Sequence, residues 1–151
     1  MTARADTIAT AVTALAAMAG LTGAAPADLA QPLSMDMLGL RSTKGKVLVC
    51  VTRRPDHFPD CRDDPEKRAF TVPAKAGQIP LGLLTPGRYA IALIHDENGN
   101  GRLDTFAGIP REGVGFSRNP ALRFGAPSFR SASFPVAGSA VEQDIRLKYF
   151  L

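Results

Sequence analysis

Residues 89–104 read YAIALIHDENGNGRLD, an apolar run that leads directly into a loop of Asp, Asn and Gly. The run is apolar at consecutive positions, which predicts a central strand that is buried on both faces. From Asp96 the loop carries side-chain oxygens at its first, third, fifth and ninth positions and a glycine at its sixth. This spacing is typical of calcium loops, because alternate residues of a tight turn direct several hard oxygens at one point.

The predicted calcium ligands are four side chains and one backbone carbonyl. They are Asp96, Asn98, Asn100, Asp104 and the carbonyl of Arg102. The loop is not an EF-hand, because Ala107 stands at position twelve, where an EF-hand has a bidentate Glu. Glu112 or water would complete the shell, and the Kd expected for extracellular calcium modules is about 10⁻⁴–10⁻³ M. The alternative interpretation of the same residues is a simple Asn-Gly hairpin turn without an ion.

His95 stands between the apolar run and the loop. In a strand it shares a face with Leu93 and points away from Asp96. We predict a structural histidine at the rim of the sheet, hydrogen-bonded to the following loop. The alternative is a metal ligand or general base, which leads to a second hypothesis, a small metal-dependent hydrolase that uses His95, Asp96 and Glu112. The chain has two His, too few for a His-rich metal centre, so a non-enzymatic module is favoured.

Further strands are indicated by alternation of apolar and polar residues on both sides of the central strand. Seven strands are expected, at residues 33–37, 46–52, 68–73, 78–84, 89–94, 129–136 and 141–149. Turn residues separate them, and we find no helical pattern after residue 27. The sequence therefore predicts one all-β domain, a seven-stranded antiparallel β-sandwich.

Residues 105–127 are rich in Gly and Pro and show neither the periodicity of a helix nor that of a strand. We predict a long irregular loop, and loops of this length are usually functional or disordered. The aromatic residues Phe106, Phe116 and Phe124 argue against disorder, since they either pack beneath the loop as a small second core or form a recognition surface. A surface for a protein or glycan partner is expected here, built from Arg111, Phe116, Arg118 and Arg123.

The first 27 residues have the parts of a secretory signal peptide. Arg4 precedes an uncharged apolar stretch at residues 7–21, and Ala25-Pro26-Ala27 supplies small residues before a cleavage point. The apolar stretch is shorter than the roughly 20 residues that span a bilayer. We therefore expect export, to the periplasm or beyond, of a single domain formed by residues 28–151, and no membrane span. The alternative is a disordered tail rich in Ala and Thr.

The chain contains two cysteines, Cys50 and Cys61. An even number of cysteines in an exported chain favours a disulfide, which would close a proline-rich connection. The alternative is a zinc site that adds His57 and His95, although the spacing fits no common zinc module.

The formal net charge of the chain is +4. Basic residues are interspersed with acidic ones and form no continuous run, so a nucleic-acid partner is not expected. We expect a monomer.

Residues 86–104 read PGRYAIALIHDENGNGRLD, which resembles the PGxYAxxxxHDxNxNGxxD pattern of the DUF2141 family. The similarity continues as GIP at 108–110, EG at 112–113, GFS at 115–117, Asn119, FG at 124–125 and PSF at 127–129. It covers about residues 35–149. The resemblance implies an exported bacterial protein with an immunoglobulin- or transthyretin-like sandwich, and it implies no activity. The sequence thus predicts an exported, calcium-binding β-sandwich module that binds a partner through residues 105–127.

We expect the mature protein to begin at Asp28, because Ala25 and Ala27 occupy the two recognition positions of the cleavage site. N-terminal sequencing of exported protein checks this. Exported protein that retains Met1 contradicts it.

Overall fold

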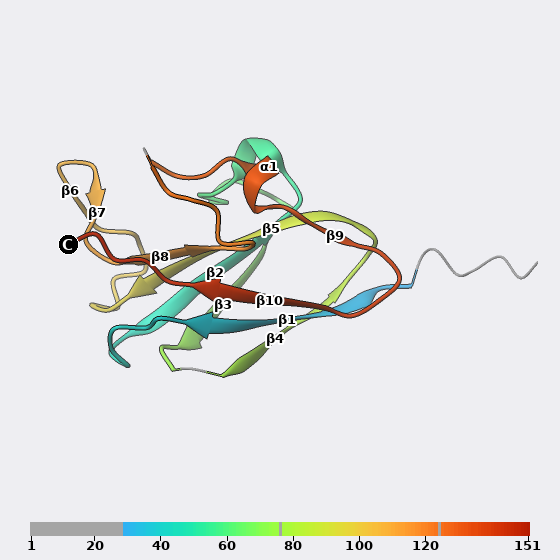
Figure 1. Cartoon of the computed structure of the whole chain (residues 1–151), viewed down its shortest axis with the longest axis horizontal. Helices are drawn as coiled ribbons and strands as arrows, with labels where there is room; N and C mark the ends of the chain where they lie inside the picture. Colours follow the sequence, from blue (N-terminus) through green and yellow to red (C-terminus); the bar gives the residue numbers. More distant parts are fainter. Residues whose placement is uncertain (1–28, 76, 124) are drawn as a thin grey trace, which may run out of the picture.

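The computed structural model describes residues 29–75, 77–123 and 125–151 (Figure 1). The predicted signal peptide and Phe124 lie outside the described residues. Among the described residues, no helix has the length and apolar character that crossing a bilayer requires.

The described residues contain strands and two short helical turns, so the predicted all-β class is confirmed. Ten strands are present where seven were predicted. They are β1 (Gln31–Leu38), β2 (Lys46–Thr52), β3 (Arg68–Pro73), β4 (Gln78–Leu84), β5 (Gly87–Asp96), β6 (Thr105–Phe106), β7 (Ile109–Pro110), β8 (Gly113–Phe116), β9 (Phe134–Val136) and β10 (Val141–Arg146). The helical turns are a 3-10 turn, η1 (Pro55–His57), and an α-helical turn, α1 (Phe129–Ala132).

The strands form two main sheets and one small hairpin. The first sheet has the order β10-β1-β4, and the second has the order β3-β2-β5-β8 with β9 also paired to β5. The strands β6 and β7 pair only with each other. The β1–β10 pair is parallel, so the prediction of a fully antiparallel fold is wrong at this pair. Parallel neighbours need a long crossover, and here almost the whole domain connects β1 to β10.

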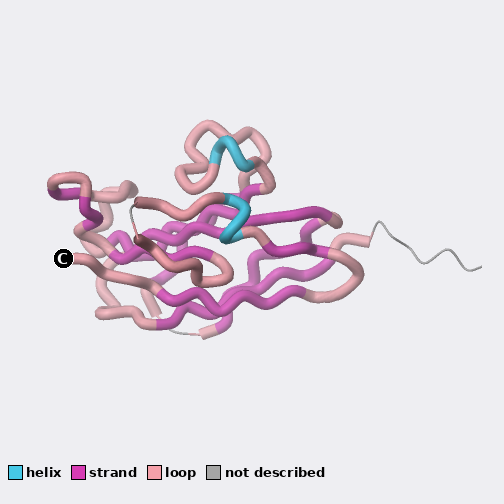
Figure 2. Tube along the Cα trace, turned by 45° about the horizontal axis from the view of Figure 1, so that its top comes forward, coloured by secondary structure: helices cyan, strands magenta, loops and turns pink. Residues whose placement is uncertain are grey.

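The main core lies between the two large sheets. Alternate residues of β1, β2 and β5 face it, as the period-two pattern predicts. These buried side chains are Leu33, Met35, Met37, Val47, Val49, Val51, Tyr89, Ile91 and Leu93. In Figures 1 and 2 the strands of both sheets run along the long axis of the molecule.

A second, smaller cluster covers the other face of β5. It consists of Ala90, Ala92, Val114, Phe116 and Ala132, with Phe58, Leu103, Leu122 and Phe129 against it. The rings of Phe58 and Phe129 meet edge to face at 6.0 Å, so η1 and α1 lie side by side over this face (Figure 2). The prediction that the central strand is buried on both faces is confirmed.

Two segments differ from the predicted pattern. Residues 105–127 are not irregular throughout, because β8 pairs with β5 from His95↔Gly113 to Ala92↔Phe116. The sequence pattern did not predict β8, because its two glycines have no side chains that would show apolar alternation. Packing nevertheless requires glycine at position 113, since a Cβ at Gly113 would lie 2.4 Å from the Tyr149 ring. The strand predicted at residues 129–136 begins only at Phe134, because α1 comes first and the Ser128 hydroxyl caps it by accepting the Ser131 N–H.

The predicted disulfide between Cys50 and Cys61 is confirmed. Both thiols are used, so the alternative zinc site is wrong. The disulfide ties the connection between β2 and β3 to the outer face of β2. Inside this connection, buried Asp64 accepts hydrogen bonds from the Thr52 hydroxyl and from the Glu66 N–H. These two bonds lower the pKa of Asp64, although burial, the largest single influence, acts in the opposite direction.

We expect the double variant Cys50→Ala/Cys61→Ala to lower the free energy of unfolding by about 3 kcal/mol, because the disulfide restricts the unfolded chain over a separation of 11 residues. Urea unfolding of the variant and of the oxidised protein measures the difference. Chemically reduced wild type is the control and should match the variant. Equal stability of oxidised and reduced protein contradicts the prediction.

Candidate functional site

The predicted calcium loop folds around the side chain of Asp96, the last residue of β5. The Asp96 side chain is completely buried, and its two oxygens accept the N–H groups of Asn100 at 3.0 Å and Gly101 at 2.8 Å. These are the fifth and sixth loop positions, so the loop closes over its first residue. The buried carboxylate has one nearby cation, the Lys46 ammonium at 3.9 Å.

The other predicted side chains meet above Asp96. The side-chain amides of Asn98 and Asn100 donate to the same oxygen of Asp104, at 2.7 and 2.8 Å. The hydrogen bond from Asn98, followed by that from Asn100 and by the charge of Arg102, lowers the pKa of Asp104 against a smaller opposing effect of desolvation. Arg102 itself has an exposed side chain that pairs with Asp104 at 3.4 Å. The structure therefore brings the predicted ligand side chains together.

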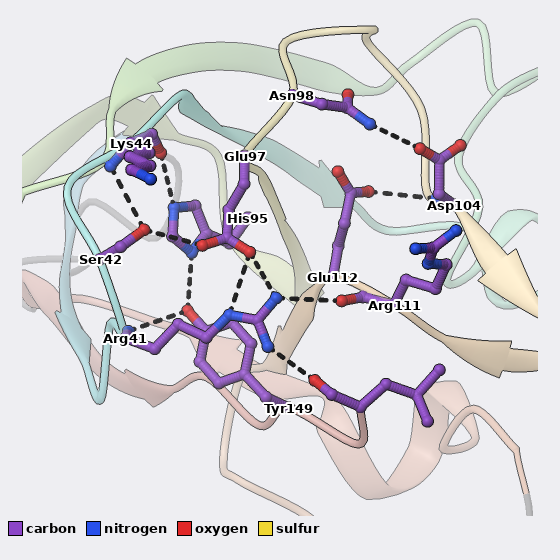
Figure 3. Close-up of polar contacts among 11 residues, drawn as sticks. Arg41, Ser42, Lys44, His95, Glu97, Asn98, Asp104, Arg111, Glu112 and Tyr149 are labelled. Carbon is purple, nitrogen blue, oxygen red and sulfur yellow. Dashed lines mark hydrogen bonds and ion pairs between the residues drawn. The ribbon is translucent and has the colours of Figure 1, made fainter.

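Glu112 joins the loop from the residue before β8 (Figure 3). Its side chain is buried, with 4 % of the residue exposed, and one oxygen accepts the Asp104 N–H at 3.1 Å. The other oxygen is buried and has no hydrogen-bond partner among the described residues. Burial raises the pKa of Glu112, the charges of Asp96 and Asp104 add to the increase, and neighbouring backbone N–H groups oppose it.

Sequence patterns indicated Glu112 either as one way to complete the calcium shell or as a residue of the alternative hydrolase. Its role depends on the pairing of β8 with β5, which the glycines of β8 concealed. Within the described residues, no group of three or more His, Cys, Asp and Glu side chains is arranged to hold a metal ion. An ion here would therefore depend on amide and backbone oxygens as well as carboxylates.

His95 is buried in the opposite direction, as strand alternation predicts. Its Nε2 lies 2.9 Å from the carbonyl of Lys44 and its Nδ1 lies 2.7 Å from the hydroxyl of Tyr149. A carbonyl only accepts, so Nε2 carries the proton and Nδ1 accepts from Tyr149. The predicted structural role is consistent with this geometry, but the predicted hydrogen bond to the following loop is wrong. The partners come from the turn before β2 and from the end of the chain.

The turn before β2 also touches the beginning of the calcium loop. Gly45 has a left-handed backbone with φ of +70°, and a Cβ there would lie 2.1 Å from the carbonyl oxygen of Asp96. Only glycine allows this approach. The turn thus supports both His95 and the Asp96 loop.

Arg41 connects the loop to the end of the chain (Figure 3). Its guanidinium donates to Glu97 at 3.0 and 2.5 Å and to the carbonyls of Leu151 and Arg111 at 2.7 and 3.2 Å. It also lies over the Tyr149 ring, 4.5 Å from the centroid. The hydrogen bond from Arg41 lowers the pKa of Glu97 against the opposing effect of burial. No sequence pattern indicated Arg41, because its partners are distant along the chain.

The four residues of the predicted partner surface do not form one patch. Phe116 is buried in the smaller cluster, whereas Arg111, Arg118 and Arg123 are exposed. Arg111 and Arg118 stand at opposite ends of β8, and seven residues of extended chain span roughly 20 Å. Arg118 also donates to the carbonyl of Ser133 at 3.1 Å. Among the aromatic residues of this segment that the structure describes, Phe106 is exposed, with 66 % of the residue accessible.

We expect Tyr149→Phe to lower the free energy of unfolding by about 1–3 kcal/mol, because it leaves the buried Nδ1 of His95 without a donor. Urea unfolding measures the loss. The matched control is Tyr89→Phe, whose hydroxyl bonds to Thr85, an exposed residue, so its loss should be smaller. Equal losses in the two variants would show that the hydrogen bond to His95 stabilises the fold no more than the hydrogen bond to Thr85, and would contradict the prediction.

Comparison with known proteins agrees with the resemblance in the sequence. A family model described as "Uncharacterized protein conserved in bacteria (DUF2141)" matches residues 36–144. No curated protein and no solved structure matches the chain. The matched region runs from β1 to β10 and includes β5, the Asp96 loop and Glu112. The chain therefore belongs to the DUF2141 family of bacterial proteins.

Proposed function

We propose that this protein is an exported, non-enzymatic binding module whose Asp96 loop holds calcium and whose residues 105–127 bind a protein or glycan partner. One observation carries the calcium proposal: the buried Glu112 oxygen that has no hydrogen-bond partner among the described residues. An ionised carboxylate that is buried without compensation is costly, so such a group is normally paired, bound to a metal or protonated.

The charge balance of the loop supports a cation. Asp96, Asp104 and Glu112 interact closely enough that the charges of the first two raise the pKa of the third. Lys46 at 3.9 Å and Arg102 at 3.4 Å offset the charge only partly, since Arg102 is exposed. Calcium bound by these oxygens would neutralise the repulsion.

The ligand set fits calcium by its chemistry. Carboxylate, amide and backbone oxygens are the ligands that calcium prefers. Asn98 and Asn100 donate from their amide nitrogens, and their amide oxygens accept the N–H groups of Asn100 and Arg102 at 3.0 Å. Each of these oxygens has a second lone pair, which could bind the ion. The set would be Asp96, Asn98, Asn100, the Arg102 carbonyl, Asp104 and Glu112. A simple hairpin turn would need no second buried carboxylate beside Asp96, so Glu112 favours calcium over the turn alone.

The geometry of His95 favours the binding module over the hydrolase. A general base needs a ring nitrogen that reaches substrate or water. Both ring nitrogens of His95 are hydrogen-bonded within the protein, and the side chain is completely buried. It also projects to the face of β5 opposite Asp96, so the two do not converge on one site.

Export is supported by the Cys50–Cys61 disulfide, since disulfides persist in oxidising compartments, and by the signal-peptide pattern of the sequence. We also infer an immunoglobulin- or transthyretin-like sandwich, supported by the shared core of the two main sheets. We also propose that the protein is a monomer.

We expect calcium to stabilise the wild type by about 1.4 kcal/mol at ten times its Kd, because it binds only the folded loop. Magnesium should do less, since it dehydrates reluctantly and requires a tighter octahedron. In Glu112→Gln the stabilisation by calcium should be largely lost. The free energy of unfolding without calcium should rise, because the substitution removes an unpaired buried charge. Melting temperature against calcium concentration measures both effects.

The matched control is Glu97→Gln, at a loop position that is not a proposed ligand. It should lower stability without calcium, because Glu97 pairs with Arg41, and should keep the calcium gain. A wild-type melting temperature that does not change up to about 10 mM calcium, well above the expected Kd, rules out the calcium proposal.

A further inference from the structure

The outer face of the larger sheet carries two rows of small or apolar side chains. Strand register places Thr71, Leu48, Ile94 and Val114 side by side across β3, β2, β5 and β8. The next row contains Cys50, Ala92 and Phe116. All seven line one cleft. They project away from the main core, because the core is filled by the alternate residues of the same strands.

Three segments form the walls of this cleft. The connection closed by the disulfide contributes Pro59 and Cys61, the β6–β7 hairpin contributes Ile109 and Pro110, and Leu122 lies on the remaining side. The cleft has a volume of about 1150 Å³. Small-molecule sites measure roughly 300–1000 Å³, so the space suits a ligand of lipid size.

Apolar side chains remain exposed at the edge of the cleft. Ile109 is 44 % accessible and Phe150 is 45 % accessible, and both line it. On the floor, Leu48 and Ile94 are half-buried, so apolar surface is accessible both at the edge and on the floor. Thr71 supplies a hydroxyl on the floor, but sugar recognition needs many polar partners, so this floor does not suit a glycan.

The charges of the cleft are mainly positive. The charged lining residues are four basic side chains and one acidic side chain, namely Arg62, Lys67, Arg102, Arg123 and Asp60. Asp60 pairs with Arg62 at 3.5 Å, and Arg102 pairs with Asp104 at 3.4 Å. Lys67 donates to the carbonyl of Arg62, whereas Arg123 is exposed and has no ion pair among the residues that the structure describes. The cleft therefore has a free cation next to an apolar floor.

We propose that this cleft binds a small amphipathic carboxylate, with its acyl chain along the two rows and its carboxylate beside Arg123. The apolar floor favours the chain, and the excess positive charge selects an anionic head over a neutral one. This inference goes beyond the proposed function, because it adds a small-molecule ligand to the protein or glycan partner proposed for residues 105–127. Gly101 and Arg102 belong both to the cleft and to the Asp96 loop, so the two sites adjoin.

The test measures decanoate binding to the full mature protein by calorimetry, below the micelle concentration, with decanol as the uncharged probe. Decanoate should bind and decanol should bind more weakly. Ala69→Trp should reduce decanoate affinity about tenfold, which corresponds to about 1.4 kcal/mol. Ala69 lies opposite Cys50 in the second row, on the outer strand β3, and is exposed, so the larger side chain fills the cleft without disturbing the core. Ala140→Trp, at an exposed residue outside the cleft, is the matched control and should bind normally.

Charge selection is tested with Arg123→Glu against Arg130→Glu, since Arg130 is exposed and outside the cleft. The first variant should weaken decanoate binding about fivefold and leave decanol binding unchanged, and the second should change neither. Absence of decanoate binding, equal binding of the two tryptophan variants, or decanol binding as strong as decanoate binding overturns the inference. If calcium stabilises the protein and a protein or glycan partner binds, but decanoate does not, the ligand class is wrong and the proposed function stands.

Discussion

The burial of β5 on both faces is the constraint on which the rest of the structure depends. One face contributes Tyr89, Ile91 and Leu93 to the main core, and the other contributes Ala90 and Ala92 to the smaller cluster. The strand pairs with β2 on one edge and with β8 and β9 on the other. Since its backbone and side chains are enclosed, its final residues are held rigidly.

The last two residues of β5, His95 and Asp96, therefore have different roles. Strand alternation sends His95 toward the core side and Asp96 toward the outer face. His95 finds a donor in Tyr149 and an acceptor in Lys44, and both come from outside β5. Asp96 instead organises a loop of backbone N–H groups. A satisfied histidine stabilises the fold, whereas a cluster of carboxylates with an unpaired oxygen requires compensation.

The outer face of the sheet links the loop to the proposed cleft. The disulfide holds the connection after β2 against this face, and the β6–β7 hairpin rises from the end of the Asp96 loop. Because Gly101 and Arg102 line the cleft, any ordering of the loop also shapes one wall. A stable sheet with segments held over one face is a common basis for ligand recognition, since a rigid scaffold positions variable loops.

The sequence by itself determined the all-β class, the central strand, the disulfide pair and the loop residues. These features are local: hydrophobic periodicity reports strand faces, and the Asp/Asn/Gly spacing reports a turn that directs oxygens inward. The family followed from the same residues. Local patterns also placed β2, β3 and β4 at their observed bounds, because each is bordered by turn residues.

The tertiary structure alone decided which distant residues meet. The parallel β1–β10 pair, β8 with its two glycines, and the contacts of Arg41 with Glu97 and Tyr149 join segments far apart in the chain. Glycine carries no side chain to reveal a strand, although Gly113 is required by the Tyr149 ring. Glu112 gained its place beside Asp96 and Asp104 only when β8 paired with β5. Such contacts leave no periodic trace, because they arise from the packing of separate elements rather than from the pattern within one.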